Sequence, residues 1–211
     1  MTVKMSTPVQ LPRTQAQRSA ETQMLLLDAT IDTLIEVGYT RASTMEIVKR
    51  SGVSRGAQVH HYGSKTGLIT AATKHLFSGF IDELEELALQ VRCSDNHLEA
   101  FLDGTLEKFF HGRFFFASLE LIIAARTDTS LKENLIPLIK EFHYRLDELW
   151  DRFFVSTDAS PANVATLLNM TLCLLRGMAV QSVLREDPDY YTEIINTWKI
   201  ILLSFLTKRD N

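Results

Sequence analysis

The sequence is short of the residues that mark several protein classes. Only 9 glycines and 5 prolines occur in 211 residues, which is too few turn formers for an all-β protein. Two cysteines, Cys93 and Cys173, make neither a disulfide framework nor a zinc signature. No apolar run reaches the roughly 18 residues of a membrane span, and residues 1–14 contain no apolar signal-peptide core. We therefore expect a cytoplasmic, all-α protein without a membrane segment.

Charge is distributed unevenly along the chain. The net charge is −4, but residues 1–75 hold nine basic side chains against five acidic ones, so residues 76–211 carry a net charge of −8. A basic N-terminal third on an acidic remainder is typical of a DNA-binding head joined to a body that does not bind DNA.

Apolar periodicity and capping residues predict about nine helices. Residues 1–18 are polar, contain no acid and carry three basic side chains, so we expect a flexible basic tail there. The predicted helices cover about residues 19–38, 44–51, 54–61, 66–92, 95–111, 114–125, 129–154, 161–185 and 188–207, with a kink or break at Pro137. Ser160-Pro161 and Asp187-Pro188 each combine an N-cap residue with a proline at the first helical position.

The two short helices after Gly38 have the layout of a helix-turn-helix. Ser43 and Glu46 form a capping-box pattern, Gly52 ends the first short helix, and Ser54 is placed to cap the second. In such a motif the second helix enters the major groove with its N-terminal residues at the base edges. The expected base-reading segment is therefore Ser54, Arg55, Gly56, Ala57 and Gln58.

Each residue of this segment has a predicted role. Arg55 offers bidentate donors to guanine and Gln58 offers a bidentate amide to adenine, while the two small residues between them allow close approach. Thr44 and Lys65 lie near the starts of helices, where a phosphate is favoured.

This region resembles the TetR family of transcriptional regulators. The matching residues, all at the family's spacing within about residues 19–70, are Gly38-Tyr39, Ser43-Thr44, Ile47, Ser51-Gly52-Val53-Ser54, Gly56, His61-Tyr62, Lys65 and Leu68. Val59 departs from the family's phosphate-contacting Tyr, and His60 beside it is a candidate substitute. The resemblance adds His60, His61 and Tyr62 to the expected DNA-binding residues.

The resemblance also implies a division of the chain and a function. It implies a helix-turn-helix domain over residues 19–65 and a helical effector-binding and dimerisation domain over residues 66–211. It further implies a homodimer that binds a double-stranded, near-palindromic operator and represses transcription until a small-molecule effector binds. Activation instead of repression remains open at this point.

Aromatic residues of the acidic body predict where an effector would bind. They cluster around residues 109–116 and 150–154, and polar residues nearby are candidate anchors. The predicted effector pocket consists of Phe109, Phe110, Phe115, Glu120, Arg126, His143, Trp150, Met170, Leu174 and Arg176. The alternative is that these aromatic side chains are ordinary core.

The last two predicted helices are the expected dimer interface. The segment 161–185 is apolar nearly all round, so one side is expected to pack on the body and the other on a second subunit. The segment 188–207 supplies Ile194, Ile195, Trp198, Ile201, Leu202 and Phe205 to the same interface.

The sequence leaves two other classes of function as alternatives to a regulator. A helical interaction module without specific DNA binding would use the basic third as a generic charged patch. A hydrolase would use Gly52-Val53-Ser54-Arg55-Gly56, which matches the nucleophile-elbow pattern but lacks a preceding strand. Glu107 and His111 have the spacing of a metal pair without a third ligand, so we expect no metal site and no cofactor.

Overall fold

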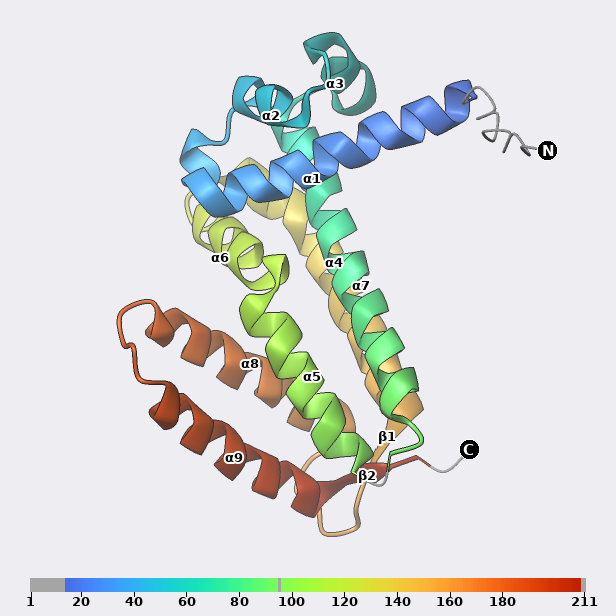
Figure 1. The fold of residues 1–211 in the computed structure, drawn as a ribbon, viewed down its shortest axis with the longest axis vertical. Coiled ribbons are helices and arrows are strands. Elements are labelled where there is room, and N and C mark those ends of the chain that lie inside the picture. Colours follow the sequence, from blue (N-terminus) through green and yellow to red (C-terminus); the bar gives the residue numbers. More distant parts are fainter. Residues whose placement is uncertain (1–13, 95, 210–211) are drawn as a thin grey trace, which may run out of the picture.

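The structure is a computed structural model that describes residues 14–94 and 96–209, and it confirms an all-α architecture (Figure 1). The described residues form nine helices: α1 Gln15–Arg41, α2 Thr44–Ser51, α3 Arg55–Tyr62, α4 Lys65–Val91, α5 His97–His111, α6 Arg113–Ala125, α7 Thr129–Phe153, α8 Val164–Ser182 and α9 Pro188–Phe205. Two strands, β1 Phe154–Ser156 and β2 Leu206–Lys208, pair antiparallel. The strands were not expected, and they end α7 and α9 slightly earlier than the periodicity predicts.

The helices are arranged along one long axis. In Figure 1, α2 and α3 lie at one end with α1 across the top of the body, and α8 and α9 lie toward the other end. Helix α4 runs from α3 down the length of the molecule beside α7. A single helix of 27 residues therefore joins the two ends of the protein.

Helix α1 begins earlier than predicted. Thr14 caps it, because its hydroxyl accepts the Gln17 N–H while the Gln17 side chain accepts the Thr14 N–H. Residues 15–18 are therefore helical, and residues 1–13 of the predicted tail lie outside the described residues. At the other end Gly38 has φ +76° and ψ 164°, which interrupts the helical backbone as its glycine predicts.

The short helices begin where their caps predict. The Ser43 hydroxyl accepts the Glu46 N–H at 3.1 Å, and the Ser54 hydroxyl accepts the Ala57 N–H at 3.2 Å. Gly52 adopts the left-handed conformation between the helices. The Glu46 carboxylate does not complete the predicted capping box and instead pairs with Arg50 at 2.7 Å.

Two features of the C-terminal half differ from the simplest expectation. Of the two alternatives predicted at Pro137, a kink or a break, the break does not occur, because α7 continues through this residue. Helix α8 begins at Val164 rather than at Pro161, since Asn163 caps it through a 2.8 Å bond to the Thr166 N–H. The predicted Asp187-Pro188 start of α9 is confirmed.

The buried core continues from one end of the molecule to the other. Leu26, Ile47 and Leu68 hold α1, α2 and α4 together at one end, and a large aromatic and aliphatic cluster joins α4 to α9 at the other. Between them, Leu34, Ile69 and Leu121 pack α1 and α4 against α6. The N-terminal head is therefore attached to the body through shared apolar contacts.

Helix α8 is strongly apolar in composition. Among the described helices, it is the one that is long and apolar enough to cross a bilayer. Its buried residues, Leu167, Leu168, Leu172 and Leu175 among them, pack into the main core. This is the pattern of a core helix with one face left uncovered.

Candidate nucleic-acid interface and ligand groove

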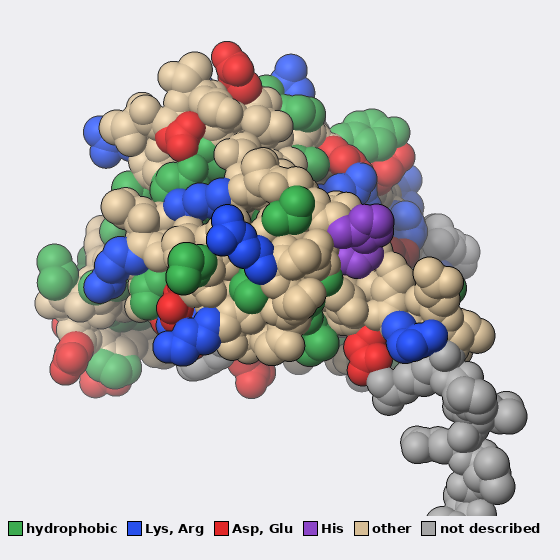
Figure 2. All heavy atoms as spheres, turned by 90° about the horizontal axis from the view of Figure 1, so that it is seen from above, with side chains coloured by type: hydrophobic (Ala, Val, Ile, Leu, Met, Phe, Trp, Pro, Cys, Tyr) green, Lys and Arg blue, Asp and Glu red, His purple; other side chains and the backbone are tan. Residues whose placement is uncertain are grey.

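The outer surface of α3 lies at the end of the molecule that Figure 2 views. Lys and Arg side chains cross the middle of this face, and histidine lies at one side. Arg55, Gly56, Val59 and His60 of α3 are exposed. Of these, Arg55, Gly56 and His60 belong to the predicted DNA-binding set, and so does Ser54, which is exposed just before α3.

The structure contradicts the predicted contact between Gln58 and adenine. The Gln58 side chain is 2% exposed, so its amide cannot reach a base edge in this conformation. Its Nε2 is buried without a hydrogen-bond partner. The apolar Val59, in contrast, is 51% exposed, so at these two positions of α3 burial is the reverse of what polarity suggests.

Other predicted DNA-binding residues lie around α3. Thr44 is partly exposed at the start of α2, and Ala57 is partly exposed on α3. His61 lies 3.4 Å from the Gln23 amide of α1, and Tyr62 packs on the core of the head, where burial raises its pKa. The two histidine rings touch edge to face with their centroids 5.0 Å apart, but His60 is exposed whereas His61 also contacts α1.

The Gly52–Gly56 segment does not form a nucleophile elbow. It follows the helix α2 rather than a strand, and the Ser54 hydroxyl accepts a backbone hydrogen bond as an N-cap. The segment is the turn of the helix-turn-helix.

Lys65 belongs to a polar junction between the head and the body, which we call the α1 junction (Gly38, Tyr39, Lys65, Glu120 and Asp128). Tyr39 is its centre. The Tyr39 N–H donates to Glu120 Oε2 at 3.2 Å, and the Tyr39 hydroxyl donates to Asp128 Oδ2 at 2.6 Å. Lys65 Nζ donates to the Tyr39 carbonyl at 2.9 Å and lies 4.4 Å from the centre of its ring.

The surroundings of the α1 junction shift the pKa values of Tyr39 and Lys65. Burial, followed by the hydrogen bond to Asp128, raises the pKa of Tyr39 to about 12. Burial lowers the pKa of Lys65, opposed by the charge of Asp128. The predicted phosphate contact of Lys65 therefore competes with its bond to Tyr39 inside the protein.

A second set of polar contacts fastens the start of α6 to α1. Arg113 lies 3.0 Å from Asp28 Oδ1 and 2.8 Å from Asp32 Oδ1, and it also donates to the Asp28 carbonyl at 2.8 Å. Together with Glu120, these contacts join α6 to α1 at two places. A displacement of α6 therefore acts directly on α1.

The structure does not bring the predicted effector-pocket residues together. Phe109, Phe115 and Trp150 are buried in the main core, so the ordinary-core alternative is correct for them. His143 and Met170 are exposed, Leu174 and Arg176 are half-buried on α8, and Glu120 contacts α1. The side chain of Phe110 lies outside the described part of the structure.

A groove with a volume of about 440 Å³ lies between α6 and α7. We call it the α6–α7 groove, and it is lined by Phe77, Ser118, Leu121, Ile122, Ala125, Arg126, Lys132, Leu135, Ile136, Ile139 and Lys140. Its size is in the range of small-molecule sites. Of the predicted pocket residues, only Arg126 lines it.

The sequence contains a signal for the residues that were missed. Lys132, Ile136, Ile139 and Lys140 follow the spacing of one helical face, with the two isoleucines between the lysines. Aromatic clustering directed the prediction to the core instead. The packing of α6 determines which face of α7 stays uncovered, and the spacing of residues within α7 does not reveal that packing.

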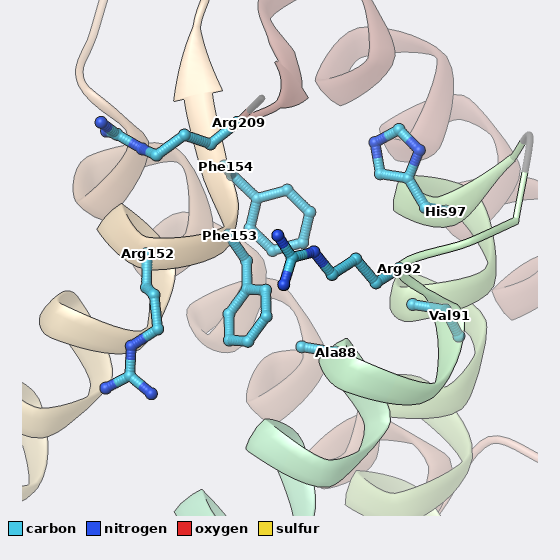
Figure 3. A pocket seen from close by; sticks show the side chains of 8 residues that line it. All are labelled: Ala88, Val91, Arg92, His97, Arg152, Phe153, Phe154 and Arg209. Carbon is cyan, nitrogen blue, oxygen red and sulfur yellow. The ribbon is translucent and has the colours of Figure 1, made fainter. Parts of the chain in front are cut away.

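A smaller hollow of about 20 Å³ lies at the far end of α4 (Figure 3). In Figure 3 the Arg92 guanidinium lies beside the Phe153 and Phe154 rings, whereas Arg152 and Arg209 point away from it. Arg152 also pairs with Glu85. A volume of this size holds about one water molecule, so the α6–α7 groove is the better candidate for a ligand site.

Comparisons with known proteins agree with the helix-turn-helix. The family model described as "Bacterial regulatory proteins, tetR family" matches residues 26–72. The HTH-type transcriptional regulator CymR of Pseudomonas putida is 30% identical over 185 residues, which cover 88% of this chain and 91% of that protein. An uncharacterised HTH-type transcriptional regulator of Mycobacterium tuberculosis is 31% identical over 183 residues, covering 84% and 93%.

The fold is also similar to solved structures. The crystal structure of a transcriptional regulator from Rhodococcus sp. Rha1 matches with a TM-score of 0.64 at 21% identity, covering 87% of this chain and 97% of that one. The similarity therefore extends through the helical body and is not confined to the helix-turn-helix.

Proposed function

The chain belongs to the TetR family of bacterial regulatory proteins, and from this premise we propose that it is a repressor controlled by a small molecule. As a member of this family it is a DNA-binding transcriptional regulator and not an enzyme. In our proposal a cytoplasmic homodimer binds a near-palindromic operator, and an effector in the body releases it.

The uncovered faces of α8 and α9 support a dimer. Leu184, two residues after α8, is 95% exposed, Ile200 of α9 is 68% exposed and Met170 of α8 is 48% exposed. Apolar side chains at these levels of exposure favour burial against another surface. A two-fold axis through α8 and α9 would give two recognition helices, which read an inverted repeat.

The observation that carries the proposal is the position of the α6–α7 groove beside the α1 junction. Glu120 of α6 and Asp128, which caps α7 through the Leu131 N–H at 2.9 Å, both hold Tyr39. The helices that line the groove are therefore the helices that hold the end of α1. A ligand that favours a different spacing of α6 and α7 would also favour a different position of the head.

Selection of bound duplexes from a random DNA library tests the operator part of this proposal. We expect an inverted repeat with half-site centres about 34–36 Å apart or a multiple of that distance. Affinity should fall steeply with salt, because phosphate contacts release counterions. Enrichment of no sequence, even at low salt, would contradict the proposal.

Two basic residues of the head allow a matched comparison on the selected operator. Arg55→Ala should lose about 1–3 kcal/mol of discrimination at one base pair. Lys49→Ala, which removes an exposed charge from α2, should weaken binding to all sequences alike. Equal effects of the two variants on specificity would remove Arg55 from the base-reading set.

A further inference from the structure

The α6–α7 groove combines an apolar floor with a cationic rim. Seven of its eleven lining residues are apolar, from Phe77 to Ile139, and the Ser118 hydroxyl already donates to the Phe115 carbonyl. The remaining three are Arg126, Lys132 and Lys140, and no acidic residue lines the groove. All three cationic side chains are exposed.

These cations differ from six other basic residues of the body, each of which forms an ion pair. In the described part of residues 76–209, the basic side chains that pair with a carboxylate are those of Lys108, Arg113, Arg145, Arg152, Arg185 and Lys199. Within the same part of the chain, Arg126, Lys132 and Lys140 have no carboxylate within ion-pair distance. This is notable in a region with a net charge of −8, because acidic partners are abundant elsewhere on it.

We propose that the α6–α7 groove binds a small amphipathic anion, with an apolar chain or ring on its floor and a carboxylate or phosphate head held by the cationic rim. The proposal rests on the proposed function, since it names the chemical class of the effector. A positively charged ligand would meet three cations and no acid. A neutral apolar ligand would make no charge interaction with the rim. An uncharged ligand is therefore the control for the contribution of the head group.

The volume and position of the groove favour a small ligand over a second subunit. A volume of about 440 Å³ suits a small molecule. The apolar surface that a second copy would cover lies on α8 and α9, farther from the head than α6 (Figure 1). The groove is thus left for a ligand when the proposed dimer forms.

Direct binding to the full chain without DNA tests the proposal by calorimetry. The probes are decanoate, decyl phosphate and 2-naphthoate, each below its aggregation concentration, with decanol and decyltrimethylammonium as the uncharged and cationic controls. Comparing the affinities of decanoate and decyl phosphate shows whether the rim prefers a carboxylate or a phosphate head group. We expect at least one anion to bind about tenfold more tightly than decanol, and the cation not to bind.

The variant that tests the rim combines Arg126→Gln, Lys132→Gln and Lys140→Gln. All three side chains are exposed, so the variant should fold, and circular dichroism checks that it does. We expect affinity for the anion to fall on the order of tenfold, since three exposed charge interactions are removed. The matched control is Arg92→Gln with Arg209→Gln, which removes two cations at the far end of α4 and should leave binding unchanged.

The outcomes separate this inference from the proposed function. Equal binding of decanol and the anions, no binding of any anion, or full affinity in the triple variant would each overturn the amphipathic-anion proposal. An anion that binds through the rim and also releases the selected operator supports both proposals. An anion that binds through the rim but leaves the operator bound supports the ligand class and refutes ligand-controlled repression.

Discussion

Replacing Gly38 with alanine should weaken the attachment of the head to the body. Gly38 has φ +76° and ψ 164°, a backbone region that is essentially restricted to glycine. A Cβ atom added there would lie 3.1 Å from Glu120 Oε2. The Glu120 carboxylate must then move by a few tenths of an ångström, away from the position in which it accepts the Tyr39 N–H.

The size of the effect follows from the backbone strain. A residue forced into this region costs about 1–3 kcal/mol, and about 2 kcal/mol lowers the melting temperature of a chain of this length by roughly 4–8 °C. The matched control is Gly79→Ala inside α4, where the new Cβ meets no atom within 4 Å. Alanine is favoured over glycine by about 0.5–1 kcal/mol in a helix interior, so this variant should be more stable than the wild type.

Thermal and urea unfolding at fixed protein concentration measure the predicted loss of stability in Gly38→Ala and the predicted gain in Gly79→Ala. The reasoning is refuted if Gly38→Ala melts at or above the wild-type temperature, because the strain would then be absent. A rise in the melting temperatures of both variants would mean that the lower flexibility of the unfolded chain outweighs the strain in the folded one.

Three further predictions concern the dimer, α3 and the α1 junction. Leu184→Asp should yield monomers in analytical ultracentrifugation, whereas Leu89→Asp, at an exposed leucine of α4, should not. Gln58→Met should leave operator specificity unchanged and match or exceed wild-type stability in urea, because it removes a buried amide nitrogen without a partner. The raised pKa of Tyr39 means that its contribution to stability is complete below pH 10 and is lost as pH rises through about 12. The stability difference between wild type and Tyr39→Phe should therefore shrink across that window, and a constant difference in urea titrations would contradict the assigned bond to Asp128.

The local features of the head could be predicted because a few adjacent residues determine them. Ser43 and Ser54 accept backbone N–H groups three residues later, and Gly52 is left-handed, as their residue types predict. The start of α9 at Asp187-Pro188 is another such case. In each of these, the hydrogen bond or the backbone angle lies within the segment that encodes it.

Features that depend on packing between distant segments could not be predicted in the same way. In the eight residues of α3 the polar Gln58 is buried and the apolar Val59 is exposed, so polarity does not identify the inner face. Phe109 and Phe114 are part of the core because they meet rings of other helices: both contact Phe80, which stacks 4.0 Å from Phe114, and Phe114 also contacts Phe142. The groove lies between α6 and α7, so it depends on how two segments pack together and is encoded by neither alone.

Regulation requires no more free energy than one hydrogen bond at the α1 junction contributes. A tenfold change in operator affinity corresponds to about 1.4 kcal/mol of differential binding between two conformations. A hydrogen bond to a charged group contributes about 1.5–3 kcal/mol, so loss of the bond from the Tyr39 N–H to Glu120 is of sufficient size. Because Glu120 lies on α6 between Arg113 and Arg126, a ligand at the Arg126 end of α6 need only rotate or shift that helix slightly to change how α1 is held.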